Sequence, residues 1–372
     1  MKTYMFPGQG SQVKGMGADL FDRYEDLTAQ ADAVLGYSIK ELCLADPRGE
    51  LNRTQFTQPA LYTVNALTYF AKIDDGAGRP DCFAGHSLGE FNALMAAECF
   101  DFVTGLKLVQ KRGELMGRIS GGAMAAVLNA SPEEIEATLA KNGLDGIDLA
   151  NHNSPSQIVI SGTADDMARA APVFKQGKVR FYPLNTSGAF HSRHMREAMA
   201  QFREFLDQHA FAAPKTPVIA NVTAQPYDGA NVVDTLARQI ANPVQWTRSV
   251  QYLLALAKSR GETMAFEEFG PGDVLARLVD AIRKQTPDAL LDGFFATRPA
   301  PAVERTSKPA SVTDKVGAWN AKHPVGTRVK STVAEYDALE TRTEAVVLFG
   351  HRAAVYMKGY NGYFDLDEIV AA

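Results

Sequence analysis

A serine flanked by two glycines is the residue best suited to covalent chemistry in this 372-residue chain. Ser87 lies in Gly85-His86-Ser87-Leu88-Gly89, which has the Gly-x-Ser-x-Gly form of a nucleophile elbow. In such an elbow, a sharp turn from a strand into a helix exposes the serine hydroxyl at the helix N-terminus. Residues 82–84 are apolar enough to end a buried strand, and residues 88–99 contain good helix formers. The pattern predicts an activated serine, but it does not specify the group that the serine accepts.

A serine nucleophile needs a base, and His191 is the strongest candidate among seven histidines. It lies in Gly188-Ala189-Phe190-His191-Ser192, where the chain returns from a predicted insertion to the main domain. Ligand sites tend to form at such junctions. His86 could line the pocket beside the serine. Four other histidines lie in polar or helical surroundings, which are typical of solvated or structurally satisfied side chains: His152, His209, His323 and His351.

The elements around these residues predict an α/β fold with an insertion. Residues 3–6 are expected to form a buried strand that ends at a glycine-rich turn, residues 7–12, which lacks the Gly-Lys-Ser/Thr of a phosphate loop. Residues 20–35 and 59–71 show helical patterns. From residue 123 the pattern predicts the ferredoxin-like order βαββαβ, with strands at 123–128, 147–151, 157–161 and 179–184 and helices at 131–141 and 164–174.

Long helices and single buried strands at 218–221 and 263–269 then resume. We therefore predict an α/β hydrolase-like large domain (1–121 and 189–296) with an inserted ferredoxin-like small domain (122–188). Pro299, Pro301 and Pro309 indicate a linker over 297–311. Short strand-like runs between glycine-rich turns predict a small β-rich C-terminal domain over 312–372. Its aromatic turn, residues 359–363, suits packing, with a docking surface as the alternative.

Composition narrows the classes of partner. The net charge of −5 and the absence of a basic run argue against nucleic acid as a partner. The three cysteines match no zinc spacing, and their odd number favours a reducing compartment over a disulfide framework. The apolar stretch before Pro7 is too short for a signal peptide, and no run of 18 apolar residues could span a membrane. The sequence thus predicts a cytoplasmic protein without a metal site.

Five motifs occur in an order that carries a family resemblance. They are Pro7-Gly8-Gln9-Gly10-Ser11-Gln12, Gly85-His86-Ser87-Leu88-Gly89-Glu90, Gln110-Lys111-Arg112-Gly113-Glu114-Leu115-Met116, Gly188-Ala189-Phe190-His191 and Asn242-Pro243-Val244-Gln245-Trp246. Together they resemble the malonyl-CoA:acyl carrier protein transacylases over residues 1 to about 290. Phe91, Asn92 and the Phe190-His191 pair are most similar to the discrete acyltransferases that serve polyketide synthases lacking their own acyltransferase domains.

The resemblance implies a role for each matching residue. Ser87 would receive a malonyl group as an ester, and His191 would act as general base and then as general acid. The backbone carbonyl of Gln245 would orient the imidazole in place of a carboxylate. The backbone N–H groups of Gln9 and Leu88 would form the oxyanion hole.

The same resemblance implies the substrate contacts. Arg112 would grip the malonyl carboxylate through two parallel hydrogen bonds, which a lysine cannot reproduce. Phe190 would limit space at the α-carbon and favour malonyl over methylmalonyl. Met116, Asn151 and Asn153 would lie near the acyl or pantetheine group. Coenzyme A thioesters and an acyl carrier protein are the expected partners of a monomer that needs no cofactor.

Two alternatives remain open from the residues. A hydrolase of the same family would use water to clear stalled acyl groups from carrier proteins. Arg112 argues against it, because uncharged acyl chains give a buried guanidinium no partner. A catalytically inactive docking protein is the other alternative, but it would lack Ser87 or His191, and both are present. Which carrier protein or product is served, and whether fatty acid synthesis is included, is not encoded in these motifs.

Overall fold

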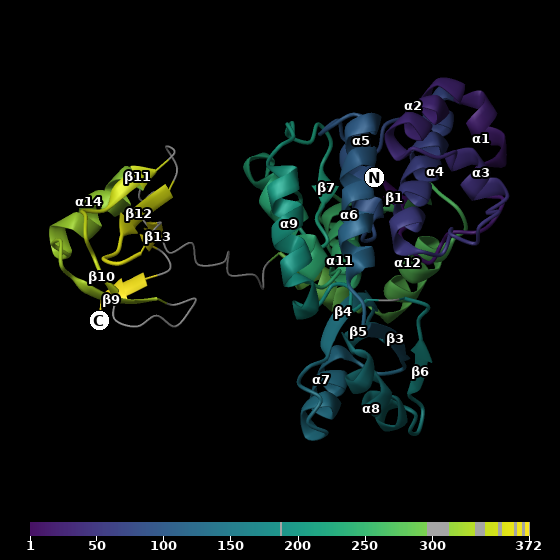
Figure 1. Cartoon of the computed structure of the whole chain (residues 1–372). Helices are drawn as coiled ribbons and strands as arrows, with labels where there is room; N and C mark the ends of the chain where they lie inside the picture. The colour runs from purple at the N-terminus through teal and green to yellow at the C-terminus, as the bar shows by residue number, and fades with distance from the viewer. Residues whose placement is uncertain are drawn as a thin grey trace. The chain divides into compact units, whose positions relative to one another are not determined.

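The computed structural model describes residues 1–186, 188–295, 312–331, 339–348, 352–360, 363–366 and 369–371. Its contacts divide the chain into two compact units, Met1–Thr297 and Arg298–Ala372 (Figure 1). The predicted linker, 297–311, lies outside the described residues. In the described part of the chain, no helix combines the length and the apolar character needed to cross a membrane.

A four-stranded parallel sheet lies at the centre of the first unit. Its order is β7 (Val218–Ile219), β2 (Cys82–Gly85), β1 (Lys2–Phe6) and β8 (Ala265–Glu268). Strands β1 and β2 are short apolar runs that are almost fully buried, as expected where helices cover both faces of a parallel sheet. Their side chains alternate between two hydrophobic clusters, so the unit has an α/β architecture with one core on each face.

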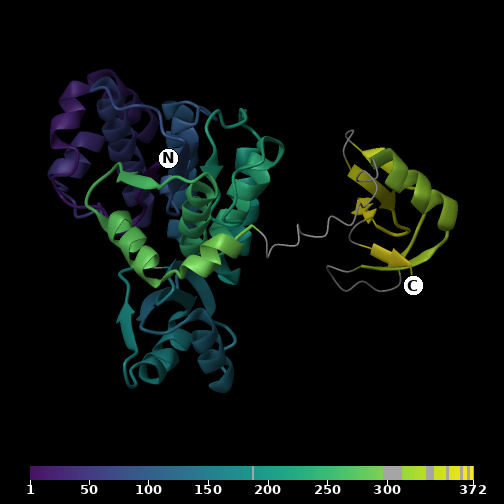
Figure 2. The ribbon, with the colours of Figure 1, turned by 180° about the vertical axis from the view of Figure 1, so that it is seen from behind.

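Helices cover both faces of this sheet. The cluster on one face includes α4 (Thr54–Asp74), α5 (Gly89–Ala96) and α6 (Phe102–Arg118), and the cluster on the other includes α11 (Trp246–Ser259) and α12 (Val274–Gln285) (Figure 2). The remaining α-helices of the unit's large part are α1 (Ala18–Arg23), α2 (Glu25–Leu35), α3 (Ile39–Leu44), α9 (Arg196–Leu206), α10 (Val232–Arg238) and α13 (Asp288–Gly293). Short 3₁₀ turns η1 (Arg193–Met195), η2 (Gly229–Asn231) and η3 (Gln239–Ala241) connect several of them.

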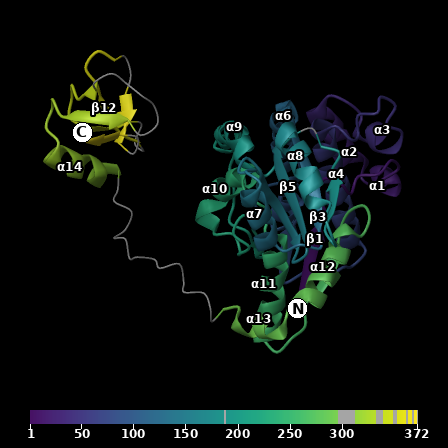
Figure 3. The same ribbon diagram turned by 90° about the horizontal axis from the view of Figure 1, so that it is seen from below.

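Residues 122–183 form a second, antiparallel sheet with two helices on one face (Figure 3). The chain order is β3 (Gly122–Leu128), α7 (Pro132–Lys141), β4 (Asp148–Ser154), β5 (Gln157–Thr163), α8 (Ala164–Phe174) and β6 (Arg180–Pro183), and the sheet order is β4-β5-β3-β6. Ser131 and Glu134 form a capping box that starts α7. Along β3, Ala125 and Val127 face the cluster with α7 and α8, whereas Met124 and Ala126 belong to the large core. One face of this sheet therefore packs onto the rest of the unit.

The edge strand β4 is also hydrogen-bonded to the large part of the unit. Asn151 and Val244 form a parallel bridge, with Val244 N donating to Ala150 O at 2.9 Å and His152 N donating to Val244 O at 2.9 Å. Arg193 of η1 binds Asp148 at the start of the same strand. These contacts fix β4, and with it Asn151, relative to the large sheet.

In its described residues, the second unit combines one helix with two three-stranded antiparallel sheets. Its elements are α14 (Val312–Lys322), β9 (Arg328–Ser331), β10 (Leu339–Glu340), β11 (Val346–Leu348), β12 (Arg352–Tyr356), β13 (Tyr363–Asp365) and β14 (Ile369–Ala371), and the sheets are β10-β9-β14 and β11-β12-β13. Strands β9, β11, β12 and β13 overlap the predicted strand-like runs. Helix α14 was not predicted; its Val316 and Trp319 pack on the small core of the unit.

Candidate active site

Ser87 occupies the turn between β2 and α5. Its φ of 51° lies in the left-handed region, which a residue with a side chain adopts only when the surroundings hold it there. Asn221 supplies one restraint, since its Oδ1 accepts the Ser87 N–H at 2.7 Å. A Cβ on Gly89 would overlap the carbonyl of Phe6, so glycine is required for α5 to start this close to β1. The local sequence therefore builds the elbow that its motif predicts.

Ser87 and His191 form a hydrogen-bonded pair. Their Oγ and Nε2 atoms are 2.7 Å apart, and His191 Nδ1 lies 2.8 Å from the backbone oxygen of Gln239. Because a carbonyl oxygen can only accept, Nδ1 carries the proton and Nε2 is free to take one from the serine. Burial, followed by the nearby Arg112 charge, lowers the pKa of His191 to about 3. The imidazole is thus neutral at pH 7, as a base must be.

The residue whose carbonyl contacts the imidazole differs from the one that the sequence predicted. Gln245 was expected to supply its carbonyl to His191, but that carbonyl accepts from Ser249 N at 2.9 Å and Ser249 Oγ at 3.0 Å at the start of α11. Gln239 takes the predicted role instead, because the turn η3 places its carbonyl against the histidine. In the structure a backbone carbonyl contacts the imidazole, but it belongs to Gln239 and not to Gln245.

Arg112 lies beside the Ser–His pair on α6 and is 1% exposed. It donates to Gln58 Oε1 at 2.8 Å, to Gln239 Oε1 at 2.8 Å and to Ser87 Oγ at 3.1 Å. Its Nε has no hydrogen-bond partner among the described residues, and none of its three partners is a carboxylate. Burial lowers its pKa to about 9. A buried cation with only neutral partners suits an incoming anion, since pairing would offset its desolvation.

The loop after β1 packs against the elbow. A Cβ on Gly8 would overlap the carbonyl oxygen of His86, so only glycine permits this approach. The approach brings Gln9 and Leu88 to the same cavity as Ser87. Leu88 is the N-cap of α5, where backbone N–H groups have no partner within the helix. Gln9 and Leu88 therefore both line the space next to the nucleophile.

The cavity above Ser87 has a volume of about 80 Å³. It is lined by Gln9, His86, Ser87, Leu88, Arg112, Met116, Met124, Asn151, Leu184, Thr186, Phe190 and His191. This volume is far below the roughly 300–1,000 Å³ of pockets that hold drug-sized ligands, so the space suits a small acyl group. Asn151 Oδ1 and Thr186 Oγ1 are buried without a hydrogen-bond partner in the described part of the chain, which leaves polar atoms available to a ligand.

Two predicted residues lie outside this cavity, and others were missed. Asn153 was expected near the substrate but pairs its Oδ1 with His86 Nε2 at 2.8 Å, so it holds His86 in place. Gln245 lines a neighbouring groove. Met124, Leu184 and Thr186 were not predicted, because they reach the site only through the packing of the small antiparallel sheet on the large part. Gln58 and Gln239 had no local motif that could have indicated them.

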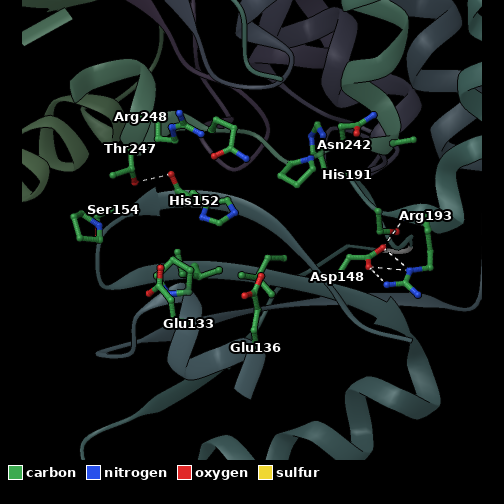
Figure 4. A pocket seen from close by; sticks show the side chains of 18 of the residues that line it. Glu133, Glu136, Asp148, His152, Ser154, His191, Arg193, Asn242, Thr247 and Arg248 are labelled. Carbon is green, nitrogen blue, oxygen red and sulfur yellow. Dashed lines mark hydrogen bonds and ion pairs between the residues drawn. The ribbon is translucent and has the colours of Figure 1, made fainter. Parts of the chain in front are cut away.

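A larger groove lies between the small antiparallel domain and the start of α11, and His191 is one of its lining residues. Its volume is about 880 Å³, and its walls include Glu133 and Glu136 on the α7 side and Thr247 and Arg248 on the α11 side (Figure 4). His191 itself lines it, so the groove leads toward the reacting pair.

The structure places a hydrogen-bonded serine–histidine pair at a strand-to-helix turn of an α/β fold, an arrangement typical of enzymes that form acyl-serine intermediates. The model of the acyl transferase domain family matches residues 3–286, and the chain belongs to this family.

The chain is similar to several curated relatives. It is 54% identical over 286 residues to the polyketide biosynthesis malonyl CoA-acyl carrier protein transacylase PksC of Bacillus subtilis, covering 76% of this chain and 98% of the relative. It is 52% identical over 287 residues to polyketide biosynthesis protein PksE of the same organism, which covers 77% of this chain but only 37% of that protein.

Solved structures show the same likeness. The malonyl CoA-acyl carrier protein transacylase of Burkholderia pseudomallei is 61% identical with a TM-score of 0.76, over 77% of this chain and 99% of that one. A complex titled as the type II polyketide synthase carrier protein AntF with its malonyl-transacylase gives 34% identity and a TM-score of 0.71, over 76% and 93%.

Proposed function

We propose that this enzyme transfers a malonyl group from malonyl-CoA to the phosphopantetheine thiol of an acyl carrier protein. The observation that carries the proposal is Arg112, a buried guanidinium 3.1 Å from the nucleophile that lacks a carboxylate partner. Malonyl is a small acyl group with a free carboxylate, so it matches both this charge and the 80 Å³ cavity. The malonyl transacylases named among its relatives support the same substrate.

The first half-reaction loads the enzyme. Ser87 Oγ attacks the thioester carbonyl while His191 Nε2 removes its proton. The resulting oxyanion accepts from the backbone N–H groups of Gln9 and Leu88. The C–S bond then breaks, His191 returns the proton to the coenzyme A sulfur, and malonyl remains as an ester on Ser87.

The second half-reaction reverses these steps. His191 deprotonates the carrier protein's thiol, the sulfur attacks the ester carbonyl, and Ser87 regains its proton as the thioester forms. Phe190 and Met116, which line the cavity, would restrict space at the acyl group, and Asn151 would contact the acyl or pantetheine group. The groove beside His191 is our proposed path for the pantetheine arm. No cofactor takes part in this scheme.

Hydrolysis, the alternative activity, is less well supported. A hydrolase that releases uncharged acyl groups would never offer Arg112 a carboxylate in direct contact, so the buried guanidinium would have no role toward its substrate. The relatives reported above are named as transacylases or polyketide biosynthesis proteins. Water attack is therefore proposed only as a side reaction.

The order of the secondary-structure elements and the names of the relatives also support a domain architecture and a biosynthetic context. We propose an α/β hydrolase-like core, residues 1–121 and 189–296, that carries a ferredoxin-like domain over 122–188, consistent with the βαββαβ order. The polyketide relatives favour a discrete acyltransferase that serves a polyketide synthase. A monomeric state, a cytoplasmic location and a docking role for the C-terminal domain remain predictions.

Intact-protein mass measurement tests the proposed activity directly. The full chain is incubated with malonyl-, methylmalonyl- or acetyl-CoA and then with a phosphopantetheinylated carrier protein. Malonyl should accumulate on the enzyme, and its mass should move to the carrier protein faster than it is lost to water. Loss to water at the same rate with and without carrier protein would contradict transfer and support the hydrolase.

Removing the C-terminal unit should leave loading intact. The catalytic residues all lie within Met1–Thr297, which is compact by itself. A chain that ends before Pro309 should therefore form malonyl-enzyme from malonyl-CoA at a rate within about twofold of the full chain. The measurement is the same mass assay, with circular dichroism as the control for folding. A folded truncation that does not load would show that the tail contributes to the active site.

A further inference from the structure

Glu90 is a buried carboxylate that the proposed mechanism does not use. It lies three residues after the nucleophile in the first turn of α5 and is 0% exposed. Its Oε1 accepts from the Tyr227 hydroxyl at 2.6 Å and from Asn221 N at 3.0 Å, and its Oε2 accepts from Gln239 Nε2. Burial raises the pKa of this carboxyl to about 7. A carboxylate this deeply buried requires a compensating charge.

The side chain of Gln239 connects Glu90 to Arg112. Its Nε2 donates to Glu90 Oε2 and, at 2.7 Å, to the backbone oxygen of Ser87, while its Oε1 accepts from Arg112 at 2.8 Å. Since a guanidinium only donates and an ionised carboxylate only accepts, the two charges fix the orientation of the amide. Glu90 and Arg112 thus form a buried charge pair separated by a single amide group.

A malonyl carboxylate bound to Arg112 would add a second negative charge near Glu90. In the free site one negative and one positive charge compensate each other, but a malonyl carboxylate would leave two negative charges sharing one guanidinium. A nearby like charge disfavours the ionised form of a buried carboxyl group. Among the described residues, the charged or titratable groups that act on Glu90 are Arg112 of α6 and Tyr227 after β7, and the tyrosine stays neutral because its pKa lies well above its usual value.

We propose that Glu90 is the counter-charge of Arg112 in the free enzyme and takes up a proton from solvent when a malonyl carboxylate binds Arg112. The Tyr227 hydroxyl donates to Glu90 Oε1, and Tyr227 as a residue is partly exposed. Glu90 is therefore a specificity-determining residue that acts through Gln239 and not by contact with the acyl group. The inference rests on the proposed malonyl activity.

Because malonyl loading is coupled to proton uptake by Glu90, the extent of loading should depend on pH. If the malonyl-enzyme holds one more proton than the free enzyme, low pH favours loading, and loading weakens as pH rises above about 7. Acetyl has no carboxylate, so acetyl loading lacks this dependence. Ionisation of the coenzyme A thiol affects both acyl groups equally and cancels in their ratio.

The wild-type full chain provides the main test. The ratio of acyl-enzyme to free enzyme is measured by intact mass at a fixed ratio of thioester to coenzyme A, between about pH 6.5 and about pH 8.5. We expect malonyl loading to fall by about fivefold or more relative to acetyl loading across this range. Parallel profiles for the two acyl groups would overturn the inference. Acetyl-enzyme without malonyl-enzyme at every pH would instead contradict the proposed function.

Two variants test whether Glu90 is the group that takes up the proton. Glu90→Gln keeps the shape of the side chain but cannot ionise, so the ratio of malonyl to acetyl loading should become independent of pH. Tyr227→Phe keeps the carboxylate but removes a hydrogen bond that lowers its pKa, so the pH dependence should persist and move to higher pH. A pH-dependent ratio in folded Glu90→Gln would assign the proton to another group and overturn the role of Glu90. Because the wild-type comparison needs no variant, the test stands even if Glu90→Gln does not fold.

Discussion

The Ser87→Ala variant should form no malonyl-enzyme, and its transfer rate should fall on the order of 10⁴- to 10⁶-fold. The reason is that both half-reactions pass through an ester on Ser87 Oγ, the atom 2.7 Å from His191 Nε2. With the oxygen removed, His191 has no nucleophile to activate, while the oxyanion donors remain. Intact mass after incubation with malonyl-CoA measures the loss of the adduct, and transfer to carrier protein measures the rate.

A buried serine elsewhere provides the matched control. Ser161 is 0% exposed, and its Oγ has no hydrogen-bond partner in the described part of the chain, so Ser161→Ala removes the same atom without breaking a contact. This variant should load as the wild type does. Gln9→Ala should also be much milder than Ser87→Ala, because the donor at Gln9 is its backbone N–H. A malonyl adduct that persists in Ser87→Ala would place the nucleophile at another residue.

The Arg112→Ala variant should lose malonyl loading while acetyl loading stays equal or increases. Truncating one partner of a buried charge pair typically costs about 2–5 kcal/mol, which corresponds to a roughly 30- to 4,000-fold loss. Acetyl has no group to pair with the guanidinium, so it loses no ion pair with Arg112 and gains space in the cavity. The ratio of malonyl-enzyme to acetyl-enzyme, measured with both thioesters present, reports the change.

Two further variants test the geometry of this effect. Arg112→Lys keeps the charge but not the planar fork, so it should recover malonyl loading only in part. Arg118→Ala removes an exposed arginine from the same helix and should leave the ratio unchanged. An equal fall of malonyl and acetyl loading in folded Arg112→Ala would show that Arg112 supports Ser87 and not the substrate carboxylate. Thermal unfolding of each variant establishes that it is folded.

Much of the fold was predictable because its elements are specified locally. The elbow needs Gly85 and Gly89 at fixed positions around Ser87, and the βαββαβ segment is marked by alternating strands and by the Ser131 cap of α7. Parallel strands β1 and β2 each contain a short apolar run, residues 4–6 and 82–84. Helix α14 had no such signal, since its stability depends on the packing of Trp319 and Val316 onto a core supplied by later strands.

The site was predictable only to the extent that motifs carry it. Sequence identified Ser87, His191, Arg112, Gln9 and Leu88, and the structure places all of them around one cavity. It could not distinguish Gln239 from Gln245, because the choice depends on which carbonyl the turn η3 directs at His191. Glu90 belongs to the elbow motif, but its link to Arg112 runs through a side chain 149 residues away.

By itself, the sequence determined the chemistry: a serine on a tight turn, a histidine at a domain junction and an arginine suited to a carboxylate. The tertiary structure decided which groups hold these residues and how their charges are balanced. The physical reason is that turns and caps depend on neighbouring residues, whereas burial and long-range hydrogen bonds arise only when distant segments meet. Gln239 is an example, because its role is visible only in the folded chain. There it contacts Ser87, Glu90, Arg112 and His191.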